Sequence, residues 1–258
     1  MNVDAYLRRI NYTGPIDRSP ETLRNLHVAH LLSVPFENLD IHLRRPIVLE
    51  DTALFGKIVG RRRGGFCYEL NGLFCRLLRE LGFAVAKLSA AVANEEGGFD
   101  PYFDHMALLV QLERPWLVDV GFGDSFRQPL LLDEPGDQTD DHEVYRIDRS
   151  GDELILLQRS HHDSGKAQYR FMLKPYEYAD YAEMCHFHQT SPNSPFTKGQ
   201  VCTLATLEGR ITLRNMRLIT TVGGDKQERS IADQEELDGL LRELFGIDLR
   251  TENEHDPR

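Results

Sequence analysis

The sequence predicts an α+β protein, because the hydrophobic pattern of its 258 residues changes twice along the chain. Up to about residue 85, apolar residues recur at steps of three and four, as on one face of a helix. After about residue 86 the period falls to two, in short apolar runs separated by Gly, Pro and Asp, which is typical of antiparallel strands in a meander or barrel. The last quarter mixes both patterns. We therefore expect three parts, with bounds 1–85, 86–185 and 186–258.

The first part contains two clear helical patterns. One runs over 23–32, with Ser19 and the proline after it as start signals, and should stop before Pro35. The other runs over 67–81, where leucines and one phenylalanine form an apolar face, and Gly82 supplies the stop.

The second part contains six strand candidates, and the third part contains three more with a helix after them. The strand candidates are AKLSAAV, HMALLVQL, WLVDVGF, EVYRI, ELILLQR, AQYRFML, VCTLAT, GRITLRN and MRLITTV. The helix should cover about 231–246, and Ser230 with Asp233 resembles a capping box at its start.

Composition excludes several classes of protein. Hydrophobic residues make up 41% of the chain, enough for a sizeable core, but no apolar run is long enough for a membrane span or a secretory signal. We therefore expect a cytoplasmic protein. The net charge of −11 argues against nucleic acid as a partner. Residues 1–90 carry +4 and the remainder −15, so the first third could face an anionic ligand or simply expose a solvated basic surface.

The four cysteines predict neither a disulfide framework nor a zinc site. Cys67, Cys75, Cys185 and Cys202 include no CxxC pair, and without an export signal they should stay reduced. His186 and His188 lie near Cys185, but no fourth ligand is in reach, so we expect no metal.

Cys67 is the one cysteine in an unusual context. It follows three arginines and two glycines in RRRGGFCYELN and opens the helix predicted over 67–81. Helix N-terminal amides and cationic neighbours both stabilise a thiolate, so this thiol is a candidate nucleophile. Cys75, two turns later on the apolar face, is expected to be core.

A nucleophilic cysteine needs a base, and the base needs a group that orients it. His105 begins one predicted strand and Asp119 lies within the next, where apolar neighbours would bury it and require a partner. Both positions are odd, so the side chains should share a face. A tight turn at 113–115 would set Asp119 opposite Leu108 or Leu109, diagonal to His105. Contact would then need a bulge or a wider loop, and spacing alone leaves this open.

Five blocks in order, PFENLDIH, RGGFCYELN, DHMALLV, WLVDVGFG and QTSPNSPFTKGQVCTLAT, resemble the arylamine N-acetyltransferases. The resemblance covers nearly the whole chain. It implies a helical bundle, an antiparallel β-barrel and an α/β lid, with a core related to the papain-like cysteine peptidases. It also implies that Cys67 accepts the acetyl group, that His105 is its imidazole partner and that Asp119 orients His105.

The resemblance further implies residues for the two substrates. Phe36, Phe122 and Phe196 match aromatic positions that line the acceptor cleft in the family, although each could equally be core. The positions near coenzyme A are Phe103, Gly121, Thr190 and Ser191. The charged residues that would meet the phosphates of coenzyme A cannot be assigned.

The function implied is transfer of acetyl from acetyl-CoA to Cys67 and then to the nitrogen of an arylamine or arylhydrazine, or to the oxygen of an N-hydroxyarylamine. Acetyl-CoA is a co-substrate, no cofactor or metal is bound, and the protein is expected to be a monomer or homodimer. Three alternatives stay open: an amide synthase of the same family that closes macrolactams, a thiol hydrolase or transglutaminase-like enzyme with the same triad, and a binding module without enzymatic activity.

Overall fold

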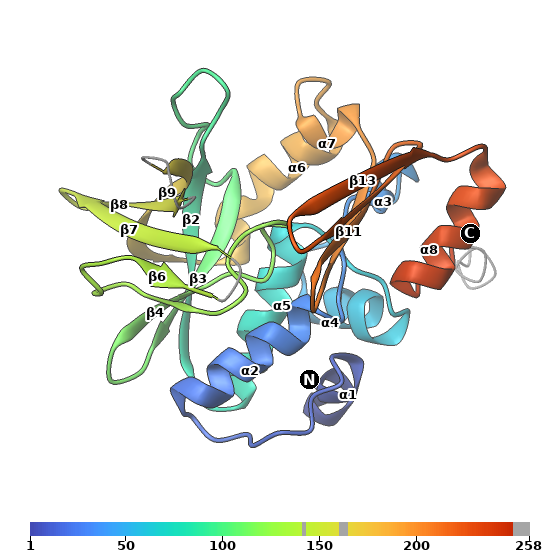
Figure 1. Ribbon diagram of the computed structural model, residues 1–258. Helices are drawn as coiled ribbons and strands as arrows, with labels where there is room; N and C mark the ends of the chain where they lie inside the picture. Colours follow the sequence, from blue (N-terminus) through green and yellow to red (C-terminus); the bar gives the residue numbers. More distant parts are fainter. Residues whose placement is uncertain (141–142, 160–164, 250–258) are drawn as a thin grey trace.

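The computed structural model describes residues 1–140, 143–159 and 165–249. It confirms the α+β class. Helix α5 (Cys67–Glu80) lies in the middle of the molecule, with a barrel-like sheet on one side and a smaller sheet on the other (Figure 1). Residues of both sheets can therefore lie close to the start of α5.

The remaining helices of the first part surround α5. They are α1 (Val3–Arg9), α2 (Pro20–Leu31), α3 (Leu39–His42) and α4 (Asp51–Phe55), which continues into a π-helical turn at Gly56–Gly60. Ser19 caps α2 by accepting a hydrogen bond from the amide of Thr22, as its place before the proline predicts. Helix α5 ends one residue before the predicted bound, with Leu81 as its C-cap.

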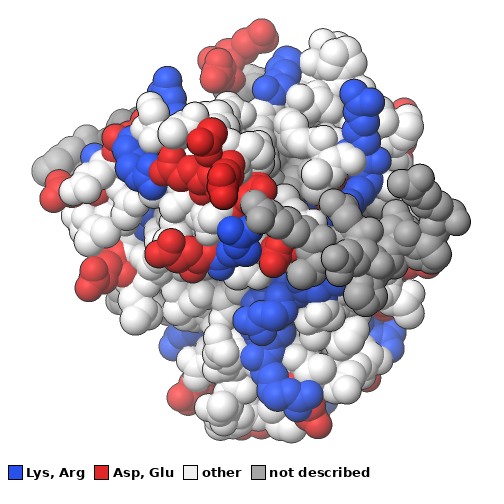
Figure 2. Space-filling model, turned by 90° about the vertical axis from the view of Figure 1, so that its right-hand side faces the viewer, with Lys and Arg blue, Asp and Glu red and all other residues white. Residues whose placement is uncertain are grey.

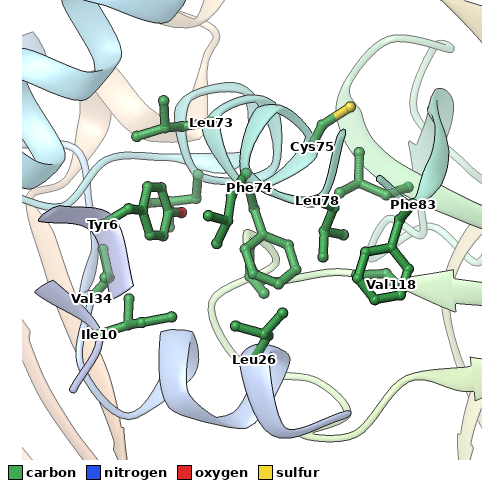
Figure 3. Close-up of a cluster of buried hydrophobic side chains, with 14 of the residues drawn as sticks. Tyr6, Ile10, Leu26, Val34, Leu73, Phe74, Cys75, Leu78, Phe83 and Val118 are labelled. Atoms are coloured by element: carbon green, nitrogen blue, oxygen red, sulfur yellow. The ribbon is translucent and has the colours of Figure 1, made fainter. Parts of the chain in front are cut away.

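The apolar face of α5 forms the core between the helices and the barrel. Phe74 lies at the centre of this core, with Leu26 of α2 below it and Tyr6 and Phe83 on either side (Figure 3). Cys75 is buried in the same cluster, so the expectation that it is a core residue is confirmed.

The barrel-like sheet contains eight antiparallel strands in the order β5-β4-β3-β2-β9-β8-β7-β6. The strands are β2 (Ala84–Val92), β3 (His105–Gln111), β4 (Pro115–Val118), β5 (Leu130–Leu131), β6 (Gln138–Thr139), β7 (Val144–Ser150), β8 (Glu153–Arg159) and β9 (Lys166–Tyr176). The side-chain amide of Gln138 joins the two edge strands, because it accepts from the amide of Leu131 at 2.8 Å and donates to its carbonyl at 2.9 Å. The barrel is thus nearly closed.

The smaller sheet has the order β1-β10-β11-β12-β13. Its strands are β1 (Phe36–Glu37), β10 (Val201–Thr206), β11 (Gly209–Arg214), β12 (Arg217–Val222) and β13 (Asp225–Ser230). A 3-10 turn at Tyr178–Tyr181 and the helices α6 (Ala182–Thr190) and α7 (Pro195–Lys198) lead from the barrel to this sheet, and α8 (Gln234–Phe245) follows it. Strand β1 comes from the helical part, and the amide of Glu37 donates to the carbonyl of Gly65 at 2.9 Å. The sheet is therefore anchored two residues before Cys67.

The structure differs from the sequence analysis in one strand of this sheet and in the cap of the helix after it. Strand β13 has no apolar residue in its sequence, lies exposed at the sheet edge and was not predicted. Because β13 extends through Ser230, that residue does not cap the last helix. The cap of α8 is Asp233, whose side chain accepts from the amide of Glu236 at 3.0 Å.

The uneven charge of the chain is visible on the surface. Figure 2 shows basic side chains in a stripe over the lower half of one face, on the right-hand side of Figure 1, where α1 lies low and α8 lies above it. Acidic side chains gather in the upper part of the same face. Of the helices in the described part of the chain, none is long and apolar enough to cross a membrane.

Candidate active site

The double glycine before Cys67 leaves room for the backbone at Pro35 and for the side chain of Glu69. A Cβ on Gly64 would lie 1.9 Å from the carbonyl oxygen of Pro35, and one on Gly65 would lie 2.7 Å from Oε2 of Glu69. Neither position can carry a side chain, since non-bonded heavy atoms do not approach this closely. Glu69 uses the space to cap α5, accepting from the amide of Phe66 at 3.0 Å.

Behind this turn lies a buried charge cluster, which we define as Glu37, Asp40, Lys57, Arg63 and Glu69. The ammonium of Lys57 lies 2.7 Å from Asp40 and 2.8 Å from Glu69. The guanidinium of Arg63 lies 2.9 Å from Glu37 and 3.0 Å from Asp40. The prediction that the arginines favour a thiolate at Cys67 therefore needs correction: Arg63 binds carboxylates of the cluster, and Arg61 and Arg62 are exposed.

The sulfur of Cys67 lies beside the beginning of β3, where the backbone N–H of Met106 donates a hydrogen bond to it. The side chain is buried, with 3% of the residue exposed. Burial raises the pKa of the Cys67 thiol, and the carboxylates of Asp104 and Asp119 raise it further, which outweighs the lowering by the Met106 amide. The resting sulfur is thus a thiol, and its ionisation depends on a base.

His105 and Asp119 are in direct contact. Nε2 of His105 lies 2.7 Å from Oδ2 of Asp119, and both residues are buried. Strands β3 and β4 pair in one continuous register that ends at Leu108 with Val118, and residues 112–114 connect them. The connection is three residues long, like the predicted turn at 113–115, but begins one residue earlier, so the register continued past Val118 would set Asp119 opposite Ala107, still diagonal to His105. The side chains nevertheless meet, so the expectation that contact needs a bulge or a wider loop is wrong. The prediction that both side chains share a face is confirmed.

The carboxylate of Asp119 has two further hydrogen-bond donors besides His105. Its Oδ1 accepts from Nδ2 of Asn71 at 2.8 Å and from the amide of Gly121 at 3.0 Å. Burial alone would raise the pKa of Asp119, but His105, Asn71 and the Gly121 amide together hold it below the ordinary value. The side-chain oxygen of Asn71 accepts from the amide of Val120 at 2.9 Å. Asp119 therefore stays ionised although its side chain is buried.

Asn71 is a functional residue that sequence reasoning missed. It lies one helical turn after Cys67 on α5, and its Nδ2 also donates to the carbonyl of Met106 at 2.6 Å. The side chain thus joins α5, β3 and the segment after β4. Its spacing of four residues from Cys67 was the available signal, because such residues share a helix face.

Gly121 packs against the backbone of Cys67. A Cβ at this position would lie 2.7 Å from Nδ2 of Asn71 and 2.9 Å from Cα of Cys67. The close approach explains the glycine without a ligand. Its predicted place near coenzyme A stays a prediction.

The other residues implied by the resemblance fall into two groups. The rings of Phe36 and Phe196 lie 6.1 Å apart, and the ring of Phe122 lies 5.1 Å from that of His105. Phe103 packs in the same apolar cluster as Cys67 and has a φ of 71°. Thr190 and Ser191 end α6, where the hydroxyl of Thr190 donates to the carbonyl of His186 at 2.8 Å. The rings surround the site, whereas Thr190 is exposed.

Within the described residues, no group of three or more His, Cys, Asp or Glu side chains is arranged to hold a metal. His188 instead lies 3.2 Å from Asp104 and 3.2 Å from the hydroxyl of Ser194. All four cysteines are free and buried.

The geometry suits acyl transfer through sulfur. A buried thiol at a helix start contacts the backbone of Met106, and the preceding residue, His105, supplies an imidazole held by an ionised carboxylate. The first amides of α5 have no intrahelical carbonyl to bind. Such amides can stabilise an oxyanion, as in other covalent acyl transfers.

Comparison with known proteins agrees with this chemistry. A family model described as N-acetyltransferase matches residues 19–254. The arylamine N-acetyltransferase of Escherichia coli is 36% identical over 249 residues, which cover 95% of this chain and 88% of that protein. The proansamycin X synthase of Amycolatopsis mediterranei is 31% identical and is covered to 98%, with 96% of this chain. The solved structure of the Mycobacterium marinum arylamine N-acetyltransferase in complex with CoA matches with a TM-score of 0.89 at 33% identity, covering 97% of this chain and 94% of that one.

Proposed function

The chain belongs to the arylamine N-acetyltransferase family and is an acetyl-CoA-dependent acyltransferase, and we propose that it carries the acetyl group as a thioester on Cys67. In this proposal His105 is the general base and acid, and Asp119 holds its ring. The observation that carries it is the buried contact of 2.7 Å between Nε2 of His105 and Oδ2 of Asp119, beside the sulfur of Cys67.

In the first half-reaction His105 takes the thiol proton as the sulfur attacks the thioester carbonyl of acetyl-CoA. Because Nε2 faces Asp119, the nitrogen that receives this proton is Nδ1. The carbonyl oxygen becomes an oxyanion near the first amides of α5. When the tetrahedral intermediate collapses, the bond to the coenzyme sulfur breaks and the imidazolium returns the proton to it, so free CoA leaves.

In the second half-reaction the nitrogen of an arylamine or arylhydrazine attacks the Cys67 thioester. His105 takes a proton from this nitrogen, the bond from acetyl carbon to sulfur breaks, and the thiol is restored with the same proton. The sulfur reaches only one acyl position, so donor and acceptor use the site in turn. The oxygen of an N-hydroxyarylamine can attack in the same way.

Substrate contacts follow from the residues around the sulfur. Phe36, Phe122 and Phe196 are proposed to face the ring of the acceptor, because their side chains lie around Cys67 and His105. Phe103, Gly121, Thr190 and Ser191 are proposed to lie along the path of coenzyme A. Cytoplasmic location and a monomeric or homodimeric state stay predictions.

The test is the release of CoA in the absence of an amine. Acetyl-CoA should release one equivalent of CoA per enzyme, leaving an acetyl adduct that maps to Cys67 by mass, and Cys67→Ser should give no burst. Initial rates should then give parallel double-reciprocal lines. Intersecting lines with no burst would instead indicate direct transfer in a ternary complex and would refute the thioester on Cys67.

A second candidate is an amide synthase that joins an amine and an acyl group of one long substrate. It is favoured by the likeness to proansamycin X synthase over nearly the full length of that protein. An experiment in which acetyl-CoA and a bulky acyl thioester compete for the enzyme separates the two functions. A synthase should be acylated faster by the bulky thioester than by acetyl-CoA. A hydrolase would differ from both, since water would release the acyl group as fast as an arylamine does.

A further inference from the structure

Two histidines of α2, His27 and His30, are fully buried in the core beneath the site. Both are close to the ring of Phe74, with centroid distances of 6.4 Å and 5.2 Å. Their polar contacts differ. His30 contacts the hydroxyl of Tyr6 in α1 at 3.1 Å. His27 instead contacts the backbone of Asp119, a residue of the proposed triad.

The contact with Asp119 occurs where the sheet can no longer hold the backbone. Pairing of β4 with β3 ends at Val118, so the amide of Asp119 lies beyond the ladder. Nε2 of His27 lies 3.2 Å from that amide nitrogen and 3.0 Å from the carbonyl oxygen of the same residue. A helix side chain therefore takes the place of the missing strand partner.

The partner of Nδ1 of His27 decides which of the two contacts of Nε2 with Asp119 is a hydrogen bond. Nδ1 lies 2.8 Å from the carbonyl oxygen of Arg127, which can only accept, so Nδ1 carries the hydrogen. Burial lowers the pKa of His27 and keeps the ring neutral. Nε2 then has a lone pair and accepts from the amide of Asp119.

His27 thus holds both ends of the segment 119–127. Its ring also stacks on Phe126 of that segment, with centroids 5.8 Å apart and an interplanar angle of 8°. Between the two ends lie Gly121, against the backbone of Cys67, and Phe122, against the ring of His105. The side chain of His27 therefore contacts the backbone of the residue that carries the carboxylate, while the carboxylate itself contacts His105.

We propose that His27 is a positioning residue of the acyl transfer, which sets the backbone of segment 119–127 so that Asp119 meets His105 in the productive orientation. This inference rests on the proposed thioester mechanism. A misplacement of about 1 Å in such a site lowers a rate by about 10²-fold. The effect should fall more on the rate of acetylation than on the binding of acetyl-CoA, since His27 binds the backbone of Asp119 directly, whereas Gly121 also packs against the backbone of Cys67.

The test compares His27→Phe, His27→Gln and His30→Phe with the unaltered enzyme in single-turnover CoA release at increasing acetyl-CoA. His27→Phe keeps a ring that can stack on Phe126 and removes both hydrogen bonds, so the maximal rate should fall about 10- to 100-fold, more than the half-saturating concentration rises. His27→Gln offers an acceptor and a donor, and should restore the rate to within about 3-fold. His30→Phe removes one hydrogen bond of the same core and should leave the rate nearly unchanged, whatever its effect on stability.

Equal losses in His27→Phe and His30→Phe, or an unchanged rate in His27→Phe, would overturn the proposal. If His27→Phe does not fold, His27→Asn replaces it, because its shorter amide cannot reach both Asp119 and Arg127. A slow His27→Asn beside a fast His27→Gln supports the positioning role, and equal rates refute it. The unaltered enzyme must itself release a burst of CoA in this experiment. If it does not, the result refutes the thioester mechanism and not the role of His27.

Discussion

Two groups of buried ionisable side chains meet at the start of α5, and they are neutralised in opposite ways. In the charge cluster, each of the two cations touches two carboxylates. In the triad, the sulfur of Cys67 faces the carboxylates of Asp104 and Asp119, and Asp119 binds the imidazole of His105. The first arrangement holds its side chains in fixed ion pairs that take no part in the proposed chemistry, whereas the second moves a proton in each proposed half-reaction.

The difference predicts that substitutions in the two groups have different consequences. A change in the triad should abolish turnover in a protein that still folds. A change in the charge cluster should lower stability and leave each folded molecule active. The following substitutions test this separation, from the largest expected effect to the smallest.

Asp119→Asn should lower the maximal rate of acetylation by about 10³- to 10⁴-fold, equivalent to about 4 to 5.5 kcal/mol. The amide can still accept from Asn71 and Gly121 through its oxygen, but its NH₂ then faces Nε2 of His105. The ring must take the tautomer with hydrogen on Nδ1, and that nitrogen can no longer receive the thiol proton. Burst kinetics of the purified variant measure the loss. A folded and fully active variant would make Asp119 a structural residue only.

Arg63→Met should cost about 3 to 5 kcal/mol of unfolding free energy, because Glu37 and Asp40 lose a buried partner. The burst amplitude per folded molecule should stay the same. Arg76→Met is the matched control, since Arg76 pairs with Glu80 and Asp51 at the surface of α5 and such pairs contribute at most about 1 kcal/mol. Urea unfolding of both variants checks the difference, and similar losses would remove the distinction drawn here.

The sequence predicted most of the helices and strands but missed an element that depends on contacts between distant parts of the chain. Helical periodicity and turn signals predicted α2, α5 and most strands, because each buries an apolar face that the pattern displays directly. Strand β13 was missed because its pairing is tertiary and its residues are all polar. The bounds of the three expected parts stay predictions.

For the site, the residue types predicted the chemistry better than the local electrostatics. The sequence placed Cys67 at a helix start, and the structure agrees. The expected help from arginine is absent, because the partners of Arg63 are residues 23 to 26 positions away that no local pattern links to it. Contact between His105 and Asp119 could not be decided from spacing, since it depends on the length of one connection and on where the pairing ends.

The smallest effect concerns the pH dependence of stability and arises from the count of charges in the cluster. Three carboxylates face two cations, so the cluster retains one negative charge unless it binds a proton. Burial raises the pKa of Glu69 to about 7, and Glu37 and Asp40 raise it as well, while Lys57 opposes the shift. In the unfolded chain a glutamate titrates near its ordinary value of about 4.3.

The sign follows from the two pKa values. Below about pH 4.3 Glu69 is protonated in both states and contributes nothing, and between that pH and about 7 only the folded state keeps the proton, so stability falls as the pH rises. The total fall is at most about 4 kcal/mol, at about 1.4 kcal/mol for each unit of pKa difference. Glu69→Gln keeps an oxygen to cap Phe66 and leaves two carboxylates for two cations, so its stability should be flatter between pH 5 and 7. Glu80→Gln, at the exposed end of the same helix, is the control and should follow the unaltered protein. Urea unfolding between pH 5 and 7 measures the free energy of unfolding of each protein. If that of Glu69→Gln changes with pH as much as that of the unaltered protein, the cluster holds no proton and its charges are balanced in some other way.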